Sequence, residues 1–171
     1  LKNGGSWETA AARMREACFD AMVKKSLEIA KNDPGGGALV FMDNSNEASS
    51  ILKKMEQAIV SENAPFKAAT RAGSEDDKSV GIAVTTKLDT AGYNFVRMGA
   101  IVTGVYAQSS ASRHQMRGRI RRVGQTRKSV DYFTIYPDNT ILSLLLQRHN
   151  GVDSKNASLE ALAKEFVKQT K

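Results

Sequence analysis

Cysteine, histidine and long apolar runs are scarce in this chain of 171 residues, which has one cysteine and two histidines. A single thiol cannot form an internal disulfide, so the chain is not a small disulfide-stabilised domain. Cys18 lies in a helical apolar pattern, and we interpret it as a small core residue. His114 and His149 stand outside any metal-ligand spacing, so no metal site is expected. Without an apolar run of membrane-spanning length or a secretory signal, an intracellular α/β domain is the expectation.

Acidic residues are absent between Asp89 and Asp131. The same stretch holds eight of the 25 Lys and Arg residues, whereas the rest of the chain has nearly equal numbers of both signs. A surface that needed only solubility would mix the two signs. The one-signed stretch therefore indicates an anionic partner, which is the phosphates of a nucleic acid, of a nucleotide, or of both.

Apolar periodicity predicts strands that alternate with helices, which is typical of a parallel sheet covered on both faces. Helices are expected over residues 7–31, 46–61, 109–123, 140–148 and 157–168, and strands over 38–42, 66–70, 80–86, 99–106 and 130–136. The glycine triplet at 35–37 precedes a strand and no Lys-Ser or Lys-Thr pair follows it, so we interpret it as a linker. Ligands of such sheets bind at the carboxyl ends of the strands.

The arginine-rich segment 113–123 is expected to be a helix with three sides. Its apolar side should dock on the sheet, and two basic stripes remain. The apolar side consists of Met116, Ile120 and Val123, one stripe of Gln115, Gly118, Arg119 and Arg122, and the other of Arg113, Arg117 and Arg121. Gly118 costs a helix roughly 1 kcal/mol relative to Ala, which suggests a close approach by a ligand or another backbone. A solvated face, a nucleic-acid surface and a phosphate site all remain open from the pattern alone.

Residues 115–125, with the pattern Q-x-x-G-R-x-x-R-x-G-Q, resemble motif VI of superfamily 2 helicases, and the ending Arg-Val-Gly-Gln is most similar to the Swi/Snf branch. Residues 85–95 resemble motif V of that branch, and residues 38–44 resemble the motif IV strand. The resemblance covers roughly residues 30–150. It implies a RecA-like three-layer α/β/α domain with a mainly parallel central sheet and flanking N- and C-terminal helices.

Further consequences of the resemblance concern ATP. In the family, the second motif VI arginine reaches across a cleft to ATP bound by a first RecA-like domain. Carried over, Arg122 is the arginine finger with Arg119 as its companion, and both are the catalytic candidates. ATP-side positions would be Gln115, Gly118, Gly92 and Asn94. A planar, always-charged guanidinium stabilises the charge that phosphoryl transfer spreads over oxygens.

Nucleic-acid contacts are implied at the strand ends. The motif V threonines contact phosphates in the family, so the candidates are Thr85, Thr86 and Lys87, joined by Asn44, Thr70 and Arg71. Hydroxyls and backbone N–H groups at strand ends can hold phosphates without reading bases. Simple β-propensity would also explain Thr85 and Thr86, and helix capping would explain Asn44 equally well.

The sequence departs from the family pattern after residue 70, where the usual helix has no room, and at residues 107–110, which replace Trp-Asn-Pro. A Walker A loop and a D-E-x-H box are also missing, so a separate N-terminal RecA-like domain would hold most of the ATP and Mg²⁺. We therefore expect a linker helix at 1–34, the RecA-like domain at 35–150 and a C-terminal helix at 151–171. The predicted function is the C-terminal motor domain of a nucleic-acid-dependent ATPase, a helicase or a translocase, with DNA favoured over RNA. The alternatives are a non-catalytic nucleic-acid-binding module and a protein-interaction domain with an acidic partner.

Overall fold

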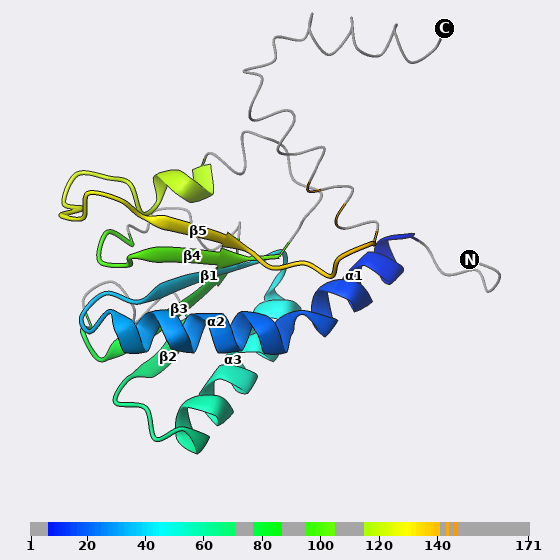
Figure 1. Cartoon of the computed structure of the whole chain (residues 1–171), viewed down its shortest axis with the longest axis horizontal. Coiled ribbons are helices and arrows are strands. Elements are labelled where there is room, and N and C mark those ends of the chain that lie inside the picture. The colour runs from blue at the N-terminus through cyan, green and yellow to red at the C-terminus, as the bar shows by residue number, and fades with distance from the viewer. Residues whose placement is uncertain are drawn as a thin grey trace, which may run out of the picture.

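A computed structural model describes residues 7–70, 77–86, 95–104 and 115–140, together with residues 143 and 146. Its centre is one sheet of five parallel strands in the order β2-β3-β1-β4-β5 (Figure 1). The strands are β1 (Ala38–Met42), β2 (Lys67–Thr70), β3 (Val80–Thr86), β4 (Ala100–Thr103) and β5 (Asp131–Thr134). All five expected strands are confirmed, with β1 and β3 at the predicted bounds and the other three shorter.

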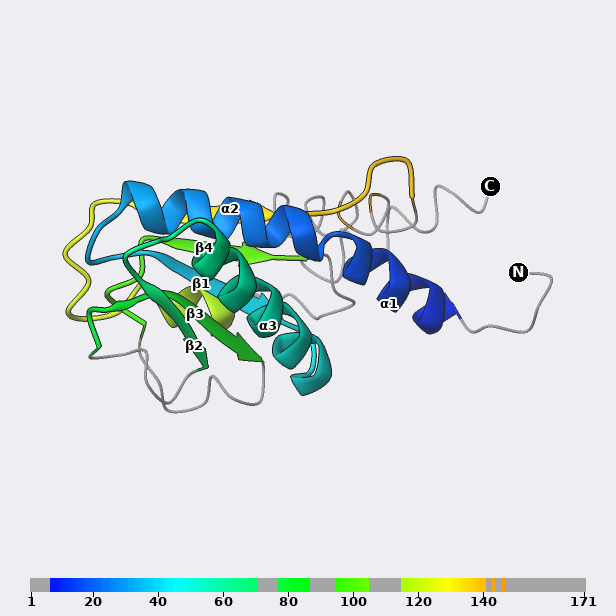
Figure 2. The ribbon, with the colours of Figure 1, turned by 90° about the horizontal axis from the view of Figure 1, so that it is seen from below.

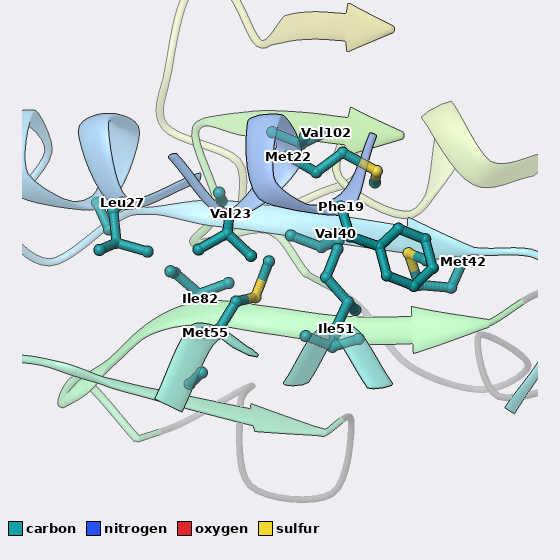
Figure 3. Close-up of a cluster of buried hydrophobic side chains, with 14 of the residues drawn as sticks. Phe19, Met22, Val23, Leu27, Val40, Met42, Ile51, Met55, Ile82 and Val102 are labelled. Carbon is teal, nitrogen blue, oxygen red and sulfur yellow. The ribbon is translucent and has the colours of Figure 1, made fainter. Parts of the chain in front are cut away.

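Two helices cover one face of this sheet, α2 (Phe19–Asn32) and α3 (Ser45–Ser61). Their apolar side chains meet alternate residues of the strands, as Figure 3 shows for Leu27 and Phe19 of α2, Met55 of α3 and Val40 of β1. Side chains along each strand alternate between the two faces, and almost every residue of β1, β3 and β4 is buried. This pattern belongs to a parallel sheet that is packed on both sides.

The single helix expected over residues 7–31 is wrong, because the structure contains two helices there. The chain forms α1 (Trp7–Ala17), breaks at Cys18, and continues as α2. The Cys18 side chain is buried as expected. Figure 2 shows α1 leading away from the sheet while α2 lies along it. The domain boundary between residues 34 and 35 stays a prediction. In the structure, α2 and the sheet share one hydrophobic core.

The opposite face of the sheet is covered by segments that follow β3 and β4. Phe95 and Met98 pack there with Met116 and Ile120, against Phe41 and its neighbours on the strands. Two of the three residues expected to dock the arginine segment are thus buried. The predicted three-layer α/β/α architecture is confirmed.

The amino ends of the strands are joined by Arg97. Its guanidinium donates to the carbonyl oxygens of Gly36 and Val80, both at 2.7 Å, and thereby links the chain before β1 to the start of β3. Burial lowers the pKa of Arg97. Gly37 lies beside this contact with φ +112°, where a Cβ would be 2.0 Å from the carbonyl oxygen of Gly81. Only glycine fits at this position.

Candidate functional site

The carboxyl ends of the strands bring together several of the predicted nucleic-acid residues. Because the strands are parallel and in register, Thr86 of β3 stands beside Met42 of β1, and Asn44 follows two residues later. Thr70 ends β2 on the other side of β3. Thr70 and Asn44 are both exposed at this edge. The structure therefore places Thr70, Thr86 and Asn44 along one edge, as the sequence predicted.

Two polar side chains of this edge, those of Asn44 and Thr85, already have local hydrogen bonds. The Asn44 side chain accepts a hydrogen bond from the Glu47 amide at 2.9 Å and so caps α3. Thr85 and Thr86 are each only 1% exposed, and the Thr85 hydroxyl donates to the Thr86 carbonyl at 3.5 Å. Their contact with nucleic acid stays a prediction. Lys87 and Arg71 lie outside the described residues.

Helix α1 approaches the same edge through Arg15. The Arg15 guanidinium pairs with Glu47 at 3.1 Å and lies 3.7 Å from Asp43. Asp43 directly follows β1 and Glu47 lies in the first turn of α3, so this arginine offsets the negative charge at the carboxyl edge.

The arginine-rich segment leaves the helix earlier than expected. Residues 115–118 are helical, and turns occupy residues 119–124. The helix predicted as far as residue 123 is therefore too long. Its third apolar residue, Val123, is fully exposed rather than docked on the sheet. Gly124 has φ +100°, which only glycine adopts readily, and it belongs to this turn.

The two catalytic candidates differ in their surroundings. Arg122 is exposed, and its Nε donates to the Gly118 carbonyl oxygen at 3.0 Å. Arg119 is half-buried, and its Nε is buried without a hydrogen-bond partner in the part of the chain that the structure describes. A buried N–H of this kind is normally satisfied, so this one is a candidate for a donor whose acceptor comes from another molecule.

Two side chains fasten the turn to the amino edge of the sheet. Gln125 donates through Nε2 to the carbonyl oxygens of Met98 at 3.3 Å and Ile120 at 3.4 Å. Arg127 donates to Asp33 at 2.7 Å, next to Gly99. Neither role was predicted. The Gly-Gln ending of the motif and Asp33 after α2 were visible in the sequence, but the contact of Arg127 with Asp33 spans 94 positions.

An open hollow of about 530 Å³ lies beside this turn. Its lining consists of Arg121, Arg122, Val123, Gln125, Arg127, Lys128, Ser129 and Val130. Among the described residues, the lining has four cationic side chains and no carboxylate. Asp33 pairs with Arg127 from outside the lining. The hollow is therefore suited to an anion that carries several negative charges.

Other predicted ATP-side residues are placed in part. Gln115 is exposed at the start of the described helical turn, and a Cβ on Gly118 would meet nothing within 4 Å. Among the described residues, none therefore accounts for the glycine at this position. Gly92 and Asn94 lie outside the described residues.

A parallel sheet of this strand order, packed on both faces, is typical of RecA-like domains. The chain has a RecA-like α/β/α fold, as do the helicase and ATPase domains to which it is similar. It superposes on the C-terminal part of the Fun30 ATPase domain with a TM-score of 0.56 and 20% identity, over 75% of this chain and 43% of that one. UvsW of T4 matches with a TM-score of 0.60 and 13% identity, over 89% of this chain and 36% of that one.

Domain 2 of the DEAD-box helicase Mss116p, solved bound to an RNA duplex, matches with a TM-score of 0.56 and 18% identity, over 85% of this chain and 58% of that one. The chain thus spans between about a third and three fifths of the length of these structures. No family model and no curated protein sequence matches it. At these identities the likeness shows the fold.

Two further features bear on the site. Nowhere in the described residues do three or more His, Cys, Asp or Glu side chains gather in a way that could hold a metal ion. Each helix that the structure describes is too short or too polar to cross a membrane.

Proposed function

We propose that this chain is the C-terminal motor domain of a nucleic-acid-dependent ATPase, a helicase or a translocase of the Swi/Snf-like branch. Arg119 and Arg122 act on ATP that an N-terminal RecA-like domain binds together with Mg²⁺. The observation that carries the proposal is the arginine turn itself. It is tied to a rigid sheet by Gln125 and Arg127, and it presents Arg122 to an open hollow.

Phosphoryl transfer explains why this arrangement needs arginine. The transferred group spreads negative charge over its equatorial oxygens, and a guanidinium can donate two parallel hydrogen bonds to them. The unpartnered Nε of Arg119 supplies a further donor that the described protein atoms leave unused. An arginine supplied across an interface contributes on the order of 10³-fold to 10⁵-fold in rate. Hydrolysis then depends on closure of the two domains, which couples it to movement.

The nucleic acid is proposed to lie along the carboxyl edge of the sheet, with DNA favoured over RNA. Thr70 and Asn44 are exposed there, and Arg15 offsets the charge of the two nearby carboxylates. Thr85, Thr86, Lys87 and Arg71 complete the proposed contact. The arginine turn lies over a face of the sheet and leads to its amino edge, so the two ligands occupy separate surfaces of one rigid body.

The deciding experiment is Arg122→Ala in the polypeptide that joins this domain to an N-terminal RecA-like domain. ATP turnover should fall by at least about 10³-fold, while affinity for duplex DNA stays within about twofold. Arg122→Lys should remain strongly impaired, because an ammonium keeps the charge but loses the planar fork. The matched control is Lys53→Ala on the exposed side of α3, which should leave turnover unchanged.

The rival function is a non-catalytic nucleic-acid-binding module that keeps the fold. In that case Arg122→Ala would weaken DNA affinity, make its salt dependence shallower, and leave no ATP turnover to lose. A protein-interaction domain with an acidic partner would show partner binding that DNA does not compete away. The 171-residue chain by itself is expected to bind ATP weakly and not to hydrolyse it. Strong hydrolysis by this chain would contradict the division of labour proposed here.

A further inference from the structure

The hollow beside the arginine turn contains more positive charge than one arginine finger requires. Besides Arg122, it is lined by Arg121, Arg127 and Lys128. Arg121 and Lys128 are exposed, and within the described ranges neither side chain has a hydrogen-bond or ion-pair partner. Clustered like charges repel one another, so their convergence on one hollow needs a compensating anion.

The surroundings add little compensation. Asp33 pairs with Arg127 at 2.7 Å from outside the lining. Asp131 lines a separate pocket of about 220 Å³ with Arg117, Arg121 and Tyr132. In that pocket Arg117 stacks over the Tyr132 ring at 4.7 Å from its centroid, so its charge is already engaged.

The backbone beneath the hollow is held in place. Gln125 is fastened to Met98 and Ile120, and its Oε1 accepts a hydrogen bond from the Arg127 amide at 3.1 Å. These contacts hold the chain at Gln125 and Arg127 in place before any ligand arrives. A ligand that bound there would not have to order this part of the chain, which favours affinity.

The geometry points to a binding site for phosphate groups in this hollow, held by Arg121 and Lys128 in addition to Arg122 and Arg127. The ligand class is an oligophosphate chain, as in a nucleoside triphosphate, and backbone phosphates of a nucleic acid have the same chemistry. The inference rests on the proposed function only through the shared Arg122. It requires no hydrolysis and no second domain, so it can be tested on this chain alone.

The test is calorimetric titration of inorganic tripolyphosphate into the 171-residue chain at about 0.1 M salt. The double variant Arg121→Ala/Lys128→Ala should bind at least about tenfold more weakly, because two exposed charge contacts are lost. The matched control is Lys24→Ala/Lys53→Ala on α2 and α3. It removes the same formal charge from exposed positions outside the hollow and should stay within about twofold.

A charge-preserving exchange, Arg121→Lys/Lys128→Arg, should retain affinity within about threefold, and it separates charge loss from misfolding. Circular dichroism of each variant should match the parent. Equal weakening by the two alanine pairs would overturn the inference, because it would show only an effect of net charge. Displacement of tripolyphosphate by poly-glutamate of equal charge would also overturn it, because carboxylates would then be equivalent ligands.

A second titration with duplex DNA identifies the source of the phosphates. If backbone phosphates of the nucleic acid occupy the hollow, Arg121→Ala/Lys128→Ala should make the negative slope of log affinity against log salt shallower by about two. If a nucleotide occupies it, that slope should not change while tripolyphosphate binding falls. Loss of tripolyphosphate binding is independent of ATP turnover in the two-domain protein, so failure of this site and failure of the motor function give different results.

Discussion

Replacing Leu27 of α2 by alanine tests whether this helix belongs to the domain or merely leads into it. The Leu27 side chain is 2% exposed and packs in the core between α2 and the sheet (Figure 3). The change removes three carbons, worth about 0.8 kcal/mol each in transfer free energy, or about 2.4 kcal/mol. The cavity that remains adds to this, so we expect a loss of about 3 kcal/mol in the free energy of unfolding.

The assay is urea denaturation followed by circular dichroism. With a slope of about 2 kcal/mol per molar urea, the midpoint should fall by about 1.5 M, and the slope itself should not change. The control is Val60→Ala on α3, where the side chain is 80% exposed and the effect should stay within about 0.5 kcal/mol. If both variants unfolded at the same urea concentration, α2 would not be part of the core, and the assignment of the helix to this domain would be refuted.

Three further outcomes follow from local geometry. Gly37→Ala should lower the free energy of unfolding by more than about 2 kcal/mol, because its Cβ would meet the Gly81 carbonyl oxygen. Gly35→Ala should cost only about 1 kcal/mol, because Gly35 has φ +87° but nothing lies within 4 Å of a Cβ there. The urea midpoints of the two variants test this difference. The Lys67 ammonium holds the pKa of Asp77 below its usual value. This ion pair therefore stabilises the fold at neutral pH, and its contribution disappears as the pH falls through the lowered pKa. In an NMR titration of the Asp77 carboxyl group, Lys67→Met should raise this pKa. Burial raises the pKa of the Cys18 thiol, so a thiol reagent at pH 8 should modify the native chain far more slowly than the urea-unfolded chain, and equal rates would contradict its burial.

The strands and the paired helices of the first layer were predictable because their signals are local. The buried runs at 38–42 and 80–86 are apolar in both of the alternating positions, and a parallel sheet covered on two faces requires this. Asn44 was recognisable as a helix cap from its position before an amphipathic run, and the structure shows the hydrogen bond to the Glu47 amide.

The errors have a common physical origin. Periodicity predicted a helix through Cys18 and another as far as Val123, but the first helix is divided at Cys18 and the second ends before Val123. At Val123 the chain has to turn toward the start of β5, and Gln125 is fastened to Met98 to make that turn. Contacts of Arg97 with Gly36, and of Arg127 with Asp33, join positions more than 60 residues apart. No local pattern encodes such pairs.

The position of β1 in the middle of the sheet has a consequence for how the chain folds. Both neighbours of β1 come later in the sequence, since β3 ends at Thr86 and β4 ends at Thr103. During synthesis, a nascent chain that has emerged only as far as α3 has two unpaired apolar edges on β1, and these edges can pair with other chains. Protein produced with a stop before residue 80 should therefore collect in inclusion bodies or on chaperones, whereas chains extended past β4 should become soluble.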